Sequence, residues 1–96
     1  MIRISINGKT RIIRKIHTHD EKHLEAEYHG WLISIYPMWG KVVRGVYRDD
    51  LETGESGVDV RGWEGGYIVN AVTKTFDAAL QMAMENILLC EPRYER

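Results

Sequence analysis

Hydrophobic and polar residues alternate at the start of the chain with the period of two that is typical of a β-strand. Isoleucine occupies every second position of residues 2–6, and Asn7-Gly8 follows directly. Asn-Gly between two β-rich runs is the strongest short signal for a tight hairpin turn. The pattern therefore predicts an N-terminal hairpin over residues 2–17, with its second strand beginning at Thr10.

Four further β-rich runs follow, separated by turn-forming residues. They predict strands over residues 28–36, 42–48, 58–63 and 67–72. The polar stretch 18–27 is predicted to be a loop that runs into the first of these strands. Proline cannot donate to a strand ladder, so residues 37–40, Pro-Met-Trp-Gly, are predicted to end that strand, which should be central in the sheet. The acidic segment 49–57 is predicted to be a loop, and the glycines at 65–66 a turn.

The last quarter of the chain changes to the three- and four-residue spacing of an amphipathic helix. Thr75 is suited to cap this helix, and Asp77 places a carboxylate at the positive end of the helix dipole. A helix is therefore predicted from Phe76 to about Cys90, with Pro92 ending it. Its apolar stripe, which should lie across the sheet, comprises Phe76, Ala79, Leu80, Ala83, Ile87 and Leu88.

These elements define an α+β fold. We expect an antiparallel, meander-like sheet of about five to six strands with an N-terminal hairpin, packed by one C-terminal helix. Six short strands could also curl into a partial barrel. The chain has 96 residues, of which 44% are hydrophobic and 28% are charged. That length and mixture support a single domain over residues 1–96 with one core.

Charge and cysteine content limit the expected partners and the expected cellular location. The net charge of −1 lacks the basic excess that is common in nucleic-acid-binding proteins. Five basic residues and no acid precede Asp20, whereas acids crowd residues 49–64. A single cysteine, Cys90, excludes an intrachain disulfide, and no signal peptide or long apolar run is visible. We therefore expect a cytoplasmic protein without membrane association.

All four histidines fall within residues 17–29. His17 and His19 would share one face of a strand, and His19 and His23 would share one face of a helical turn. Two imidazoles with a carboxylate are a common zinc set, so His17, His19 and His23 form a candidate metal site. The competing interpretation is a solvated connection with no cofactor, which we prefer.

Catalytic patterns are weak. The serines lack a recognisable nucleophile elbow, and Cys90 lies near the C-terminus of the predicted helix, where the dipole opposes a thiolate. The acidic segment lacks the ligand spacing of a calcium loop, and the glycines do not form a phosphate-binding loop before a helix. We therefore expect that the chain is not an enzyme.

Aromatic and basic residues form the better candidate site. Trp39 and Trp63 each lie beside glycine in predicted turns, and exposed tryptophan with nearby arginine is a typical anchor of a protein interface. Arg44 and Arg48 would share one face of the predicted strand 42–48, and Tyr36 would lie nearby if the neighbouring strands pair in register. These five residues are the predicted protein-binding site.

The functional expectation is a noncatalytic protein-binding or regulatory module, such as an inhibitor or adaptor encoded by a mobile element. Small size, charge polarity and the lack of recognisable chemistry favour it, and association with its own copy as a homodimer stays open. The alternative is a protein that binds single-stranded nucleic acid, because aromatic rings stack on bases and arginine neutralises phosphate. The acidic segment argues against this alternative.

The C-terminal part resembles the strand-then-helix ending of many small bacterial and phage proteins. The resemblance covers about a quarter of the chain and is carried by Gly66-Tyr67-Ile68-Val69 and by Thr75-Phe76-Asp77-x-Ala79-Leu80-x-x-Ala83. Some of those proteins are antitoxins or nucleic-acid-binding sheets. The resemblance therefore implies an antitoxin-like regulator as a further form of the alternative.

Overall fold

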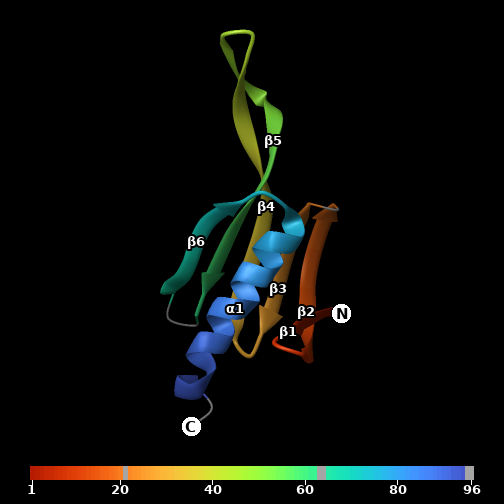
Figure 1. Cartoon of the computed structure of the whole chain (residues 1–96), viewed down its shortest axis with the longest axis vertical. Helices are drawn as coiled ribbons and strands as arrows, with labels where there is room; N and C mark the ends of the chain where they lie inside the picture. Colours follow the sequence, from red (N-terminus) through yellow and green to blue (C-terminus); the bar gives the residue numbers. More distant parts are fainter. Residues whose placement is uncertain (21, 63–64, 95–96) are drawn as a thin grey trace.

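The computed structural model describes residues 1–20, 22–62 and 65–94, and no side chain at 19, 20 or 91–94. Its elements are β1 (Ile2–Ile6), β2 (Lys9–Asp20), β3 (His23–Tyr28), β4 (Trp31–Val43), β5 (Val46–Arg61), β6 (Tyr67–Thr73) and α1 (Phe76–Tyr94). The strands form one antiparallel sheet in chain order, and α1 packs against one side of it (Figure 1). The predicted α+β class and strand number are confirmed.

The sheet curls as a half-barrel because β2 changes its partner along its length. Residues 9–13 pair with β1, whereas residues 14–20 pair with β3 across two register shifts. Register shifts mark bulges, which bend a strand and increase its twist. The bend brings β1 back to α1, so that the helix contacts both ends of the meander.

Three hairpins close with two-residue turns, which are Asn7-Gly8, His29-Gly30 and Arg44-Gly45. All six residues have positive φ, between 50° and 85°. Positive φ at both positions is the signature of the type I′ turn, whose twist matches that of the flanking strands. The predicted N-terminal hairpin is confirmed, and its turn lies where Asn-Gly placed it.

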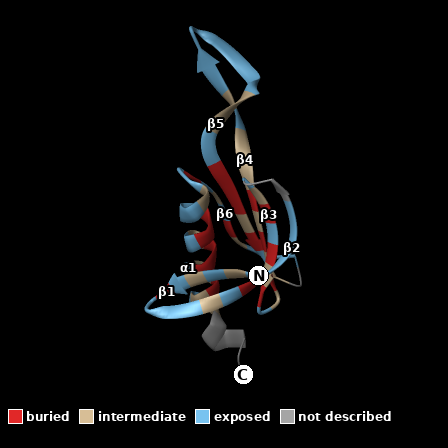
Figure 2. Ribbon diagram, turned by 90° about the vertical axis from the view of Figure 1, so that its right-hand side faces the viewer, coloured by how far each residue is buried: buried red, intermediate tan, exposed pale blue. Residues whose placement is uncertain are grey.

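The core lies between α1 and the inner face of the sheet. Ile33, Ile35 and Val58 supply its centre from β4 and β5, and all three are at most 1% exposed. The buried side chains of α1 are Ala79, Leu80, Ala83, Met84 and Ile87, so Met84 joins the predicted stripe. Figure 2 shows the buried surfaces of the sheet and the helix turned towards each other. Burial of each large side chain contributes about 1.5–3 kcal/mol.

The start of α1 is as predicted, but its end is not. The Thr75 hydroxyl accepts a hydrogen bond from the Ala78 N–H at 3.0 Å, and the first helical bond joins the Ala79 N–H to the Thr75 carbonyl. The helix then continues through Pro92 to Tyr94, so the predicted stop is wrong. A proline in the last turn costs a backbone hydrogen bond there, while packing on the sheet holds the earlier turns.

Three predicted breaks are absent from the described chain. Residues 18–20 and 23–27, predicted as a loop, lie in β2 and β3, which pair with each other. Residues 37–40 continue β4 instead of ending it, and the acidic segment 49–57 belongs to β5. Proline is tolerated because the register of β4 against β5 shifts directly after Pro37, where the regular ladder is interrupted.

Beyond the other strands, β4 and β5 continue as a two-stranded projection, which we call the arm (residues 38–55). It extends the long axis of the molecule, whose extents are 53 × 25 × 23 Å (Figure 1). Between the pairs Pro37–Ser56 and Lys41–Arg48, β4 advances four residues and β5 eight. The two resulting bulges add twist, and the ribbons of β4 and β5 cross within the arm (Figure 2).

Candidate protein-binding arm

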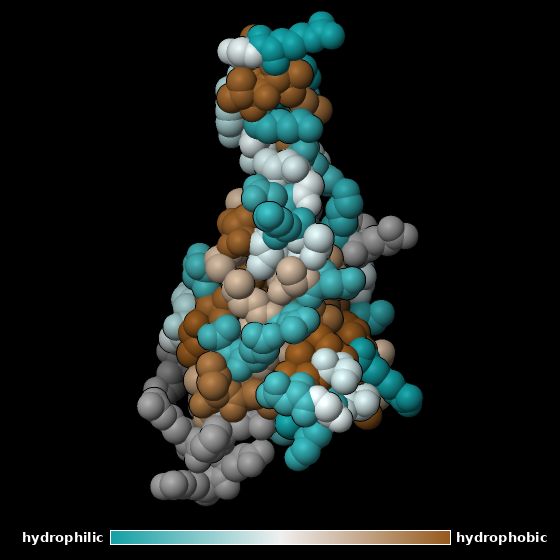
Figure 3. Space-filling view, in the orientation of Figure 1, coloured by the Kyte–Doolittle hydropathy of each residue, from teal (hydrophilic) through white to brown (hydrophobic). Residues whose placement is uncertain are grey.

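The end of the arm exposes a cluster of apolar side chains. We call residues 39–48 the tip, and its exposed hydrophobic residues are Trp39, Val42, Val43, Val46 and Tyr47. Trp39 is 53% exposed and Tyr47 is 65% exposed. Figure 3 shows hydrophobic atoms gathered near the end of the arm, separated from the body by a more polar stretch. Exposed apolar clusters of this kind mark interaction surfaces.

Cross-strand packing orders the tip before any partner binds. Val42 pairs with Tyr47 and Val43 pairs with Val46 across the hairpin. The Tyr47 side chain lies over Gly40, whose φ is 100°, and a Cβ at that position would overlap the tyrosine hydroxyl. The ring therefore covers bare backbone next to the turn, a packing arrangement that supports glycine in a strand.

Every charged residue of the tip is a cation: Lys41, Arg44 and Arg48. Arg48 donates two hydrogen bonds to Asp50, at 2.9 and 2.7 Å, and this interaction holds the pKa of the Asp50 carboxyl below its usual value. Lys41 and Arg44 form no ion pair with any described residue. The outermost surface of the molecule is thus apolar and positively charged.

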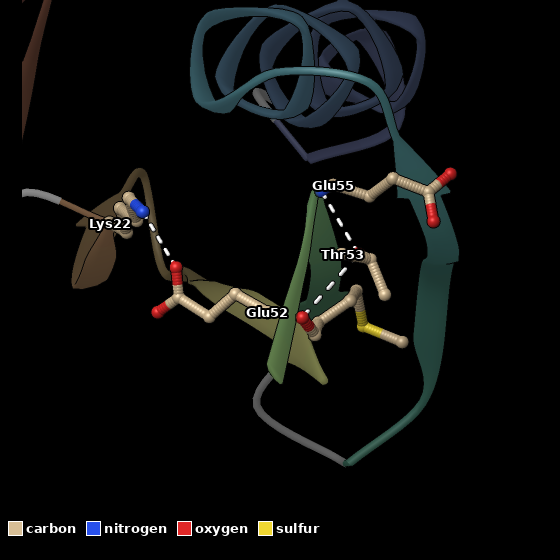
Figure 4. Close-up of polar contacts among 5 residues, drawn as sticks. Lys22, Glu52, Thr53 and Glu55 are labelled. Atoms are coloured by element: carbon tan, nitrogen blue, oxygen red, sulfur yellow. Dashed lines mark hydrogen bonds and ion pairs between the residues drawn. The ribbon is translucent and has the colours of Figure 1, made fainter. Parts of the chain in front are cut away.

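Polar contacts hold the base of the arm. Lys22 directly precedes β3 in the chain. Its ammonium group binds the Glu52 carboxylate at 2.6 Å (Figure 4). The Thr53 hydroxyl accepts a hydrogen bond from the Glu55 N–H at 3.1 Å and donates one to the Met38 carbonyl at 3.4 Å. These contacts lie at the bulges, where the regular strand ladder is interrupted.

The five predicted protein-binding residues separate into three groups. Trp39, Arg44 and Arg48 lie together on the arm. Tyr36 lies in the body, so the prediction that it neighbours the two arginines is wrong. Trp63 falls outside the described residues, and its predicted role stays a prediction.

The strand predicted over residues 42–48 is also wrong. Arg44 and Gly45 form the turn at the end of the arm, so Arg44 and Arg48 do not share a strand face. Trp39 was expected in a turn and lies instead within β4. The physical reason is that positive φ at both turn residues reverses the chain inside the predicted strand.

Sequence reasoning missed four apolar tip residues: Val42, Val43, Val46 and Tyr47. A signal for them exists, because Val-Val and Val-Tyr flank Arg44-Gly45 and glycine is the preferred second residue of a type I′ turn. Arginine at the first position is unusual, since Asn or Asp is preferred there. For this reason the sequence pattern did not predict the hairpin that Arg44-Gly45 closes.

Tyr36 belongs to a polar cluster on the face of the sheet opposite α1. Its hydroxyl donates a hydrogen bond to the Asp59 carboxylate at 3.2 Å, and its ring lies over Gly57. Burial, followed by the charge of Asp59, raises the pKa of Tyr36. The other carboxylate oxygen of Asp59 is buried without a hydrogen-bond partner among the described residues. These contacts stabilise the neutral tyrosine.

Small hollows on the same face include one of about 230 Å³, lined by Glu27, Leu32, Arg61 and glycine backbone. Ligand pockets in proteins typically reach about 300–1,000 Å³. Glu27 is already engaged by Arg14 at 2.6 Å. The hollow is thus a weaker candidate site than the arm.

Two of the three predicted metal ligands, His17 and His23, lie on the neighbouring strands β2 and β3. His17 pairs with Glu25 across β2 and β3, and His23 begins β3. Among the described side chains, no three metal-ligating residues come together, but the side chain of His19 is not among them. The zinc hypothesis for His17, His19 and His23 therefore stays a prediction.

Comparison of the chain with protein-family models, curated proteins and solved structures found no match. Within the described residues, α1 is not apolar enough over its length to cross a membrane.

Proposed function

We propose that the chain is a noncatalytic protein-binding module whose arm docks against another protein. One observation carries the proposal: five exposed apolar side chains lie at the end of an arm that supplies no residue to the core. No other part of the chain that the structure describes covers this exposed apolar surface. Contact with a partner would remove it from water, which is favourable.

The charges of the tip indicate the chemistry of the partner site. Lys41 and Arg44 suit an apolar cleft bordered by carboxylates, because complementary charges steer association and select the partner. A polyanion is less well suited, since the rest of the arm carries four acids, namely Asp49, Asp50, Glu52 and Glu55. Single-stranded nucleic acid, including an antitoxin-like role, is therefore the second candidate.

Regulation by contact, as an inhibitor or adaptor, fits a module of this size. An arm that reaches away from the body can occupy a cleft in a larger protein without any chemistry of its own. Cytoplasmic location forms part of the proposal, because Cys90 is an unpaired thiol in the chain.

The turn at the end of the arm supports a functional role for Arg44. Its φ of 53° is left-handed, a conformation that costs most side chains roughly 1–2 kcal/mol per residue and asparagine less. The turn between β1 and β2 has asparagine at the equivalent position, Asn7. A strained residue at an exposed tip suggests that its side chain serves a contact.

Affinity capture from the source lysate, with and without nuclease, tests the proposal. The wild-type chain should retain a protein that resists nuclease, and the Val42→Ser/Val46→Ser variant should lose it. The matched control, Ile12→Ser/Leu89→Ser, changes two exposed apolar residues outside the arm and should retain it. Equal capture by the arm variant would refute the proposal, and loss on nuclease treatment would favour nucleic acid.

The Arg44→Asn variant separates the effect of Arg44 on partner binding from its effect on stability. The substitution should leave the thermal midpoint unchanged or raise it, because asparagine tolerates the left-handed turn, and it should weaken capture of the same protein. Circular dichroism and quantitative capture measure the two effects. If Arg44→Asn binds as well as the wild type, Arg44 is not part of the contact.

A further inference from the structure

The last strand of the sheet has an open edge. β6 pairs with β5 on one side, and no described residue pairs with its other side. Figure 1 shows β6 at the border of the sheet, with α1 lying across the inner face. A free edge presents unpaired backbone N–H and C=O groups to any strand that approaches it.

β6 has little of the usual protection against such pairing, since its one register shift lies near its start, where Ile68 is the extra residue between Tyr67 and Val69. Its seven residues, Tyr-Ile-Val-Asn-Ala-Val-Thr, include no charge and no proline. Tyr67 is 57% exposed and Val72 is 49% exposed. At the opposite edge, by contrast, β1 carries a charged residue, Arg3. Natural proteins usually block exposed edges with charge, proline or bulges.

Asn70 is the central residue of β6, and its neighbours Val69 and Ala71 are both apolar. These residues lie in the part of β6 that pairs regularly with β5. If two copies pair antiparallel around a two-fold axis at Asn70, the two Asn70 residues face each other and Val69 of each copy faces Ala71 of the other. An apolar pair thus lies on each side of the axis, and no like charges oppose each other. An isologous interface requires this kind of self-complementarity.

We propose that β6 is the interface of a homodimer, in which two copies pair their β6 strands antiparallel about Asn70 and join their sheets into one. A second copy is the occupant that this strand fits, because the central residues of β6, Val69-Asn70-Ala71, are neutral and self-complementary about the axis. The register leaves both arms free, since β6 borders β5 only at residues 56–61. The dimer would present two arms and bind a repeated target with avidity.

The proposal does not depend on the function of the arm, and molecular mass tests it. Sedimentation equilibrium of the wild-type chain should give twice the monomer mass of 11.1 kDa. Asn70→Lys should give the monomer mass, because two ammonium groups would oppose each other at the axis. Asn70 is exposed, so the variant should keep its thermal midpoint and circular dichroism. The matched control, Asn70→Thr, should remain dimeric.

A cysteine at the axis tests the register. In a Cys90→Ser background, Asn70→Cys should form an intermolecular disulfide on mild oxidation, because directly opposed residues of antiparallel strands have Cα atoms about 4.5–5.5 Å apart. Asp77→Cys, exposed on α1, is the control and should not.

Three outcomes would overturn the proposal. A wild-type chain that stays monomeric at its highest soluble concentration excludes the dimer. A dimer that survives Asn70→Lys, or that is lost only in Val42→Ser/Val46→Ser, places the interface elsewhere. A dimer that Asn70→Cys fails to cross-link excludes the register.

Discussion

Two tyrosines lie over glycines of a neighbouring strand, and each pair has a different consequence. Tyr47 covers Gly40 on the exposed arm, where it orders the tip. Tyr36 covers Gly57 in the body, where the glycine is buried. A Cβ at either glycine would overlap the ring, so the absence of a side chain permits the close approach. Ring and glycine thus act as one packing unit.

Tyr36 should make stability depend on pH in the alkaline range. Its pKa in the folded chain is raised, first by burial and then by Asp59, whereas in the unfolded chain it is about 10. The stabilisation is complete below the unfolded pKa and is lost as the pH rises through the folded pKa, because the phenolate would adjoin a carboxylate. Urea unfolding of the wild type and of Tyr36→Phe from pH 8 to pH 11 measures the effect.

The comparison with Tyr36→Phe removes the titration of every other group from the result. Below pH 10 the wild type should be the more stable by about 1 kcal/mol or more, since the variant leaves Asp59 without its hydrogen-bond donor. The difference should shrink as the pH rises above 10. A difference that stays constant to pH 11 would show that Tyr36 does not titrate there.

At the scale of the element, α1 is defined by its first turn and by its apolar stripe. The Thr75 hydroxyl caps one backbone N–H, and the Thr73 hydroxyl donates to the Thr75 carbonyl at 2.8 Å, which links the end of β6 to the helix start. Ala79 and Ala83 let the helix approach the sheet closely because their side chains are small, and both are fully buried. The element is thus specified locally and stabilised by packing.

Thr75→Ala should lower the free energy of unfolding by about 1 kcal/mol, because the Ala78 N–H would lose its hydrogen-bond acceptor. Thr75→Ser keeps the hydroxyl and should stay within a few tenths of a kcal/mol of the wild type. Urea denaturation at neutral pH measures both values. Equal destabilisation by alanine and serine would attribute the effect to the lost methyl group rather than to the cap.

For the whole molecule, the arm and the core are separate. Joining Pro37 to Ser56 through Asn-Gly, in place of residues 38–55, should leave a folded body, because no core residue lies in the arm. The exposed ion pair between Lys22 and Glu52 would be lost, which costs about 0–1 kcal/mol. The thermal midpoint and circular dichroism test folding, and affinity capture tests the expected loss of the partner protein.

A truncation before Phe76 is the contrasting control. It removes the buried face of α1 and exposes the inner face of the sheet, so the remaining chain should be unfolded. If removal of the arm unfolds the body as completely as removal of α1, the arm is a structural element and its tip need not contact a partner.

Sequence alone determined the features that depend on neighbouring residues. The N-terminal hairpin followed from Asn7-Gly8 and alternating isoleucines, and the helix start followed from Thr75. Turn dihedral angles and helix caps involve residues close in the chain, so their signals are local. The α+β class followed from the same local patterns, because hydrophobic periodicity reports which side of each element is buried. The number of strands agrees as well, although β3 was predicted as a loop and the strand predicted over residues 42–48 contains a turn.

Tertiary structure decided the arm and the membership of the candidate site. Pro37 and the acidic residues 49–57 looked like breaks, yet they lie in strands because β5 bulges twice against β4. Strand register depends on the partner strand, whose position no local pattern records. That register gathers Trp39, Arg44 and Arg48 at the arm and leaves Tyr36 on the body.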